Sequence, residues 1–259
     1  DLPVGRTATM FKSDPKFDPT SWNNYAIRRL CSIKVFSGIS SEVEDLLRVE
    51  NVDPSDCDNY AIRKASKLGN FLAVRGLLTD KRVDPCAKNN EALKGACKIG
   101  CADTVYELLS DSRVDPSIDN LHATLLEIAI TNNHSEVAYE LLRDKRVDPS
   151  VPNNKPIVLA SQMNLVQTII DLLADERVDP TYNNNECLRV ACENSCYDAV
   201  ELLLNDGRVD PTRNENEVLA IADKNMDFEM VDLLLGDYRL NSHPRADGSP
   251  CRKKLKTIM

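Results

Sequence analysis

Hydrophobic and polar positions recur along this chain in a fixed frame about 31 residues long. The frame is marked by the tripeptide Val-Asp-Pro, which occurs six times, and its successive aspartates are separated by 31, 31, 33, 31 and 31 residues. The six aspartates are Asp53, Asp84, Asp115, Asp148, Asp179 and Asp210. A repeat of this period predicts stacked supersecondary units, each of which contacts only its neighbours.

Each unit is predicted to hold two short helices. In the unit that begins at Asp53, apolar residues have helical spacing over residues 61–68 and again over residues 72–78. Gly69 separates the two stretches and predicts the end of the first helix. Pro54 fixes a turn before the pair, and the Asp53 carboxylate can accept a hydrogen bond from the backbone two residues on.

Two further positions recur in register. An asparagine precedes the first helix in most units and is predicted to cap its first turn. These residues are Asn24, Asn59, Asn90, Asn154, Asn185 and Asn216, with Thr124 in the fourth unit, which has two extra residues near Leu121 and His122. A leucine pair ends each second helix, and we expect its second member to be buried between layers. The leucines concerned are Leu78, Leu109, Leu142, Leu173 and Leu204.

Small residues in the first helix, a glycine after it and two leucines in the second helix together resemble the ankyrin repeat. Ala65, Gly69, Leu77 and Leu78 match these positions, and the likeness covers seven units from Asp18 to Leu240. The resemblance implies an all-α ankyrin-type solenoid. It divides the chain into an N-terminal extension (1–17), a repeat array (18–240), and a C-terminal cap with a basic tail (241–259).

The chain departs from the ankyrin pattern in two ways. The family's Thr-Pro-Leu-His opening is replaced by motifs such as the Asn-Tyr-Ala-Ile-Arg of residues 59–63. Most units are also about two residues shorter than the usual 33. We therefore expect a tight turn where the family has a β-hairpin finger.

Composition and charge narrow the classes of partner. The formal net charge is −9, which disfavours nucleic acid, because proteins that bind it usually present a clustered basic face. The one basic run, within residues 252–256, is interpreted as a solvated tail. No apolar stretch approaches the ~18 residues of a membrane span. Nine cysteines, several at small core positions, favour a reducing intracellular compartment, cytoplasmic or nuclear. We expect a monomer.

No residue pattern predicts catalysis, a cofactor or a metal site. The pairs Cys97/Cys101 and Cys192/Cys196 lie three repeats apart and have no histidine at zinc-finger spacing, so they are interpreted as small core residues. The alternating aspartates of residues 53–58 lack the glutamate that closes a calcium loop. The three histidines, His122, His134 and His243, form no recognisable triad. We therefore expect a protein that is not an enzyme.

An Asp-x-Arg motif precedes each Val-Asp-Pro except the first and also occurs in the last unit, as Asp237 and Arg239. Two functions are consistent with it. The charges could form a ladder that grips a charged polymer, or they could form an internal network between adjacent connectors. We favour the internal network, because each unit supplies both charges.

The resemblance also implies where a partner binds, because ankyrin proteins use their connector tips and the exposed end of the first helix. Residues at these places vary from unit to unit while the frame repeats. The candidate partner-binding residues are Tyr60, Lys67, Glu91, Lys98, Lys155, Gln162, Glu186, Glu193, Glu217 and Lys224.

The predicted function is a non-catalytic scaffold that binds a protein partner on the concave face of the solenoid. The chain begins at Asp1 rather than at a methionine. It could therefore be a segment of a longer product, and one alternative is a targeting or regulatory repeat domain of a larger protein whose activity lies elsewhere. A nucleic-acid-binding solenoid agrees less well with the acidic composition.

Overall fold

The computed structural model describes residue 18 and residues 20–33, 39–117 and 121–241, without the side chains of residues 21–23 and 121–124. The predicted N-terminal extension, the basic tail, His122, His243 and the cap at Thr124 fall outside this description. The described part is all-helical, with 15 helices and no strand. The helices are α2 (Ser21–Leu30), α3 (Ile39–Leu47), α4 (Asp56–Lys67), α5 (Phe71–Leu78), α6 (Ala87–Ile99), α7 (Ala102–Ser110), α8 (Leu121–Thr131), α9 (Ser135–Arg143), α10 (Lys155–Gln162), α11 (Val166–Leu173), α12 (Tyr182–Glu193), α13 (Tyr197–Asn205), α14 (Arg213–Lys224), α15 (Phe228–Leu235) and α16 (Tyr238–Asn241).

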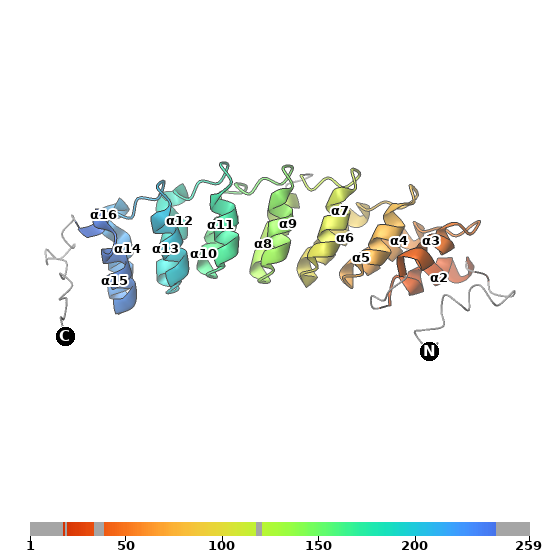
Figure 1. Ribbon diagram of the computed structural model, residues 1–259, viewed down its shortest axis with the longest axis horizontal. Helices are drawn as coiled ribbons and strands as arrows, with labels where there is room; N and C mark the ends of the chain where they lie inside the picture. The colour runs from red at the N-terminus through yellow and green to blue at the C-terminus, as the bar shows by residue number, and fades with distance from the viewer. Residues whose placement is uncertain (1–17, 19, 34–38, 118–120, 242–259) are drawn as a thin grey trace. The chain divides into compact units, whose positions relative to one another are not determined.

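The helices form seven consecutive pairs, as predicted, and α16 adds one turn after the last pair. The chain divides into two compact units, which meet in the sequence between Val147 and Asp148. We call them unit 1, with α2 to α9, and unit 2, with α10 to α16. Within each unit, first helices pack against first helices and second helices against second helices (Figure 1).

The core of each unit is built from the repeated small and branched residues. Ala65 and Ala96 of the first helices and Val83 and Val114 of the connectors are at most 1% exposed. In the five pairs whose second leucine was predicted to be buried, the first member is fully buried and the second is only half-buried. The prediction that the second leucines are buried between layers is therefore wrong. The helix turns about 100° per residue, so it directs only one leucine of each adjacent pair into the core.

Four of the repeated asparagines, Asn24, Asn59, Asn154 and Asn185, bond to the Asp-Pro turn of the following repeat. The buried Oδ1 atoms of Asn90 and Asn216 have no hydrogen-bond partner among the described residues. Asn59 has φ +58° and Asn154 has φ +52°. The Asn59 Oδ1 accepts a hydrogen bond from the Asp84 backbone N–H at 2.7 Å, and the Asn154 Oδ1 accepts one from Asp179 at 2.7 Å. Asn154 makes no side-chain capping bond to its own helix. The capping prediction is wrong at Asn59 and Asn154, because each side-chain amide bonds to the Asp-Pro turn of the following repeat instead.

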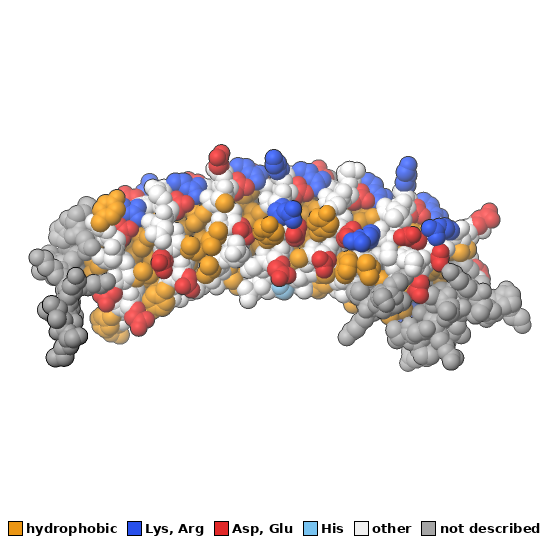
Figure 2. Space-filling model, in the orientation of Figure 1, with side chains coloured by type: hydrophobic (Ala, Val, Ile, Leu, Met, Phe, Trp, Pro, Cys, Tyr) orange, Lys and Arg blue, Asp and Glu red, His pale blue; other side chains and the backbone are white. Residues whose placement is uncertain are grey.

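Two side chains hold the connector of each repeat, namely the aspartate of the Asp-Pro turn and the arginine of the Asp-x-Arg motif. The Asp53 carboxylate accepts a hydrogen bond from the Ser55 backbone N–H at 2.9 Å, as predicted, and the same turn recurs at the other Asp-Pro sites. The described connectors contain turns and no strand, in agreement with a trimmed finger. Lys and Arg side chains gather along this connector edge in both units (Figure 2).

The Asp-x-Arg motif forms an internal network. The Arg113 guanidinium donates to the carbonyls of Val83 at 2.7 Å and Leu78 at 2.9 Å in the preceding repeat, and it pairs with Asp111. Arg82, Arg146, Arg208 and Arg239 make the equivalent bonds to the preceding repeat. Carbonyls at the end of a helix lack partners within that helix, so each arginine caps the preceding second helix.

The arginines also change the acidity of their aspartate partners. Hydrogen bonds from the guanidinium hold the pKa of each aspartate in the motif below its usual value. This applies to Asp80, Asp111, Asp144, Asp175, Asp206 and Asp237. The network is therefore fully charged at neutral pH.

The cysteines at the small first-helix positions are core residues, as predicted. Cys31, Cys97 and Cys192 are fully buried, at the same register position as Ser66 and Ser161. Burial raises the pKa of the Cys97 thiol to about 12. Cys57, in contrast, is exposed.

The burial of the leucine pairs predicts unequal effects of truncation. Leu108→Ala should lower the free energy of unfolding by about 2–5 kcal/mol, because Leu108 is fully buried. Leu109→Ala should cost less, since Leu109 is half-buried. Denaturant unfolding followed by circular dichroism measures both. Equal losses would contradict the assignment of the two leucines.

The arginine network predicts acid sensitivity. Arg113→Ala should lower the free energy of unfolding by about 1–3 kcal/mol near pH 7, because it removes hydrogen bonds from a charged donor. The neighbouring Ser112→Ala should change it by less than ~0.5 kcal/mol. An aspartate whose pKa is lower in the folded chain stabilises it above its unfolded pKa, and that stability is lost as pH falls through the folded pKa.

The difference between wild type and Arg113→Ala should therefore shrink as the pH of denaturant unfolding is lowered from about 7 to about 3. A difference that is independent of pH would show that the Asp111–Arg113 pair contributes nothing to stability.

The buried thiols predict selective alkylation. Iodoacetamide should modify the exposed Cys57 well before Cys97, which is buried and holds its proton. Peptide mass spectrometry over a time course distinguishes the two sites. Equal rates in the folded protein would contradict the core position of Cys97.

Candidate functional site

The ten candidate residues all lie on first helices, at the surface that we call the first-helix face. In unit 1 this face consists of the described side chains of α2, α4, α6 and α8 that are exposed or half-buried, and in unit 2 of those of α10, α12 and α14. Six of the ten are exposed, namely Lys67, Lys98, Lys155, Gln162, Glu193 and Lys224. Tyr60, Glu91, Glu186 and Glu217 are half-buried.

In unit 1 the structure brings three candidates into one cluster. Tyr60 lies between two guanidinium groups, with Arg28 at 5.6 Å and Arg63 at 6.0 Å from its ring centre. Glu91 of α6 forms salt bridges with Arg63 and Lys67 of α4. The hydrogen bond from Lys67 is the main cause that lowers the pKa of the Glu91 carboxyl. The sequence did not predict this pairing between two candidate residues.

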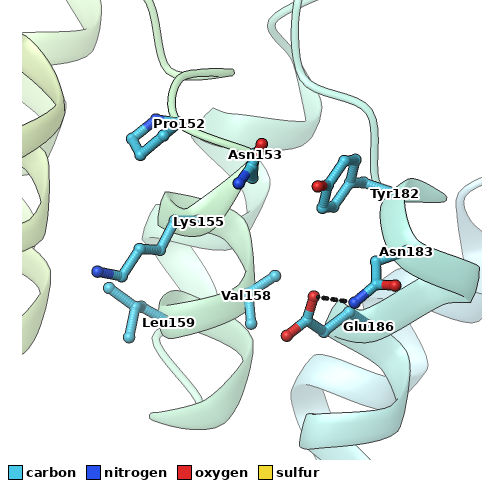
Figure 3. A pocket seen from close by; sticks show the side chains of 8 residues that line it. All are labelled: Pro152, Asn153, Lys155, Val158, Leu159, Tyr182, Asn183 and Glu186. Carbon is cyan, nitrogen blue, oxygen red and sulfur yellow. Dashed lines mark hydrogen bonds between the residues drawn. The ribbon is translucent and has the colours of Figure 1, made fainter. Parts of the chain in front are cut away.

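In unit 2 the structure places Lys155 and Glu186 around one hollow of about 350 Å³ between α10 and α12 (Figure 3). Val158 and Leu159 of α10 give the hollow an apolar wall. The Asn183 Nδ2 donates to a Glu186 carboxylate oxygen at 2.8 Å, which orients that carboxylate. Pro152, Asn153 and Tyr182 complete the lining.

This hollow has the chemistry of a binding site for a side chain. It presents one cation, one oriented carboxylate and an apolar wall. The two charged groups can bind the polar end of a partner's side chain, and the apolar wall can contact the carbon atoms of that side chain. The hollow is open to solvent and small, so it suits part of a peptide better than an enclosed small molecule.

The remaining candidates lie along the same face of unit 2. Glu217 accepts a hydrogen bond from Asn214 at 2.9 Å and lies 3.8 Å from the Arg189 guanidinium. Gln162, Glu193 and Lys224 are at the last residues of α10, α12 and α14. The ten residues therefore form two separate groups, one on each unit.

A second hollow, of about 420 Å³, lies on the second helices of unit 1 and was missed from the sequence. It is lined by Tyr106, Leu109, Ser110, Glu140, Arg143, Asp144 and Lys145. Tyr106 and Tyr139 are about half-exposed at equivalent positions of α7 and α9. Exposed aromatic residues at one register position were the signal available. Hydrophobic side chains gather along this second-helix face (Figure 2).

The described residues contain no group of three His, Cys, Asp or Glu side chains that could hold a metal ion. His134 is engaged structurally, since its Nε2 donates to the Lys98 carbonyl at 3.1 Å. Its ring also packs against Gly100, where a Cβ would come within 2.5 Å of the imidazole. Among the described helices, none is long and apolar enough to cross a membrane.

Comparison with known proteins agrees with the fold. Residues 126–215 match the family model described as ankyrin repeats (3 copies). No curated protein matches the chain. Ankyrin repeats are generally modules for protein–protein interaction and are typically not catalytic. Residues 126–215 therefore match ankyrin repeats, and the helix pairs of the described residues agree with an all-α solenoid of the ankyrin type.

Proposed function

We infer that this chain is a non-catalytic scaffold that binds a protein partner through its first-helix face. The observation that carries this proposal is the division between repeated and varied residues. The repeated residues make contacts within the protein. They are the arginines, the asparagines, the valines and the first leucine of each pair. The residues that vary from repeat to repeat lie at the surface of the first helices, where a partner can contact them.

The geometry of the face supports this proposal. Lys155 and Glu186 line a hollow with an apolar wall, and Tyr60 lies half-exposed between two arginines. Aromatic and arginine side chains are enriched at protein interfaces, where they supply contact area and directed hydrogen bonds. An intracellular setting agrees with the number of unpaired thiols.

A direct test is affinity capture with the chain as bait, followed by mass spectrometry. We expect a partner that wild type retains and that the variant Lys98→Glu, Lys155→Glu, Lys224→Glu loses at least tenfold. Lys67 is left unchanged, because its salt bridge with Glu91 would mix binding with stability. Exposed substitutions of this kind should each change the free energy of unfolding by less than ~0.5 kcal/mol.

The matched control is Arg48→Glu, Lys81→Glu, Lys145→Glu, which makes the same change in net charge at exposed connector positions outside the first-helix face. The control should retain the partner. If Arg113→Ala abolishes capture at full stability while the three lysine reversals have no effect, the arginine network is the binding site and the proposal is wrong.

A further inference from the structure

Charge is segregated between the two helix layers of unit 1. The first helices α2, α4, α6 and α8 carry eight basic and four acidic residues, whereas the second helices α3, α5, α7 and α9 carry two basic and seven acidic residues. The basic residues of the first layer are Arg28, Arg29, Arg63, Lys64, Lys67, Lys88, Lys94 and Lys98. In unit 2 the first helices α10, α12 and α14 carry four basic and five acidic residues. Basic residues therefore outnumber acidic ones on the first helices of unit 1 but not on those of unit 2. The chain as a whole is acidic.

The face of unit 1 already holds one carboxylate. Glu91 lies between Arg63 and Lys67, which both reach it from the preceding repeat. Gly95 makes this possible, because a Cβ at that position would come within 2.7 Å of the Lys67 side chain. The geometry thus shows how two basic side chains of one first helix receive an acidic side chain from the next layer.

The same pair of basic residues recurs one repeat later without that acidic neighbour. Lys94 and Lys98 stand 31 residues after Arg63 and Lys67. The backbone bonds that end the first helices, from Cys101 to Ala96 and from His134 to Ala129, set an offset of 33 residues between α6 and α8. The position that corresponds to Glu91 is therefore Thr124, which carries no charge, and the asparagine position is Ala123 and not Thr124 as expected from the sequence. The acidic residue of α8, Glu127, corresponds to Lys94 itself. Among the described residues, the salt bridges of this face include no carboxylate partner for Lys64, Lys94 or Lys98.

We propose that the first-helix face of unit 1 binds an acidic peptide segment of the partner, with one of its carboxylates between Lys94 and Lys98. In this arrangement the partner supplies the acidic side chain that Glu91 supplies one repeat earlier. The inference rests on the proposed function and specifies the chemistry of the partner. Charge complementarity of this kind speeds association and excludes basic partners.

An acidic peptide fits this face better than a nucleic acid does. Asp56, Asp58 and Glu91 lie on the same first helices as the basic residues. A phosphate backbone carries a negative charge at every nucleotide, so it would meet these carboxylates as well as the lysines. A peptide can place neutral residues opposite them and acidic residues opposite Lys94 and Lys98.

The test uses fluorescence anisotropy with a labelled oligoglutamate peptide of about twelve residues, which spans about 40 Å when extended. Wild type should bind it, and binding should weaken as salt is raised because salt screens exposed charges. Lys94→Gln with Lys98→Gln should weaken binding about three- to tenfold. The control pair Lys81→Gln with Lys145→Gln removes the same charge from connector positions and should leave binding unchanged.

A second variant acts in the opposite direction. Glu91→Gln releases Arg63 and Lys67 from their internal partner, so it should tighten binding of the peptide about two- to fivefold. Glu186→Gln, at the corresponding position of unit 2, makes the same charge change and should have no effect. A general loss of structure cannot produce tighter binding, and circular dichroism confirms that each variant is folded.

Three results would overturn the inference. They are no binding of oligoglutamate at low salt, equal effects of the Lys94/Lys98 and control pairs, and equally tight binding of single-stranded DNA of similar length with the same variant pattern. If oligoglutamate fails while a captured partner still depends on Lys155 and Lys224, the scaffold function stands and the acidic-peptide inference fails. If oligoglutamate binds as expected but capture finds no partner that depends on the face, the scaffold function fails instead.

Discussion

The bond from each repeated arginine to the backbone of the preceding repeat is the constraint on which the connectors depend. Its guanidinium is held by its own aspartate and donates to two carbonyls, one at the end of a second helix and one in the connector. A helix of eight or nine residues is marginal alone, and its last carbonyls lack partners. By supplying those partners from the next repeat, the arginine makes the end of one helix depend on the position of its neighbour.

Most of the frame could be predicted from the sequence, because helical spacing and turn residues report on short-range structure. The helix pairs, the Asp-Pro turns, the buried cysteines and the internal role of the Asp-x-Arg motif are confirmed. The two errors concern properties that the repeat pattern alone does not fix. Asn59 was predicted to cap its own helix, but its side chain bonds to the following repeat. Leu78 was predicted to be buried, but the direction of its side chain leaves it half-buried.

The candidate surface was predictable as a set of positions but not as a set of contacts. Register placed all ten residues on first helices, since a repeated fold puts equivalent positions on one face. It could not show that Glu91 is satisfied by Arg63 and Lys67, or that Lys155 and Glu186 share a hollow. These pairings join residues 24 to 31 positions apart, and they depend on how the side chains of adjacent repeats interleave. The hollow on α7 and α9 was missed for the same reason.

Repetition also provides an internal standard for what each surface position can do. Because successive repeats place equivalent side chains in equivalent surroundings, a contact seen in one repeat shows the geometry available in the next. The frame residues cannot vary without loss of their backbone partners, so differences between repeats accumulate at the first-helix face. Where one repeat has a charge pair and its neighbour has only the basic half, the difference comes from the sequence and not from the fold. The specificity of such a solenoid is therefore encoded in departures from its own repeat.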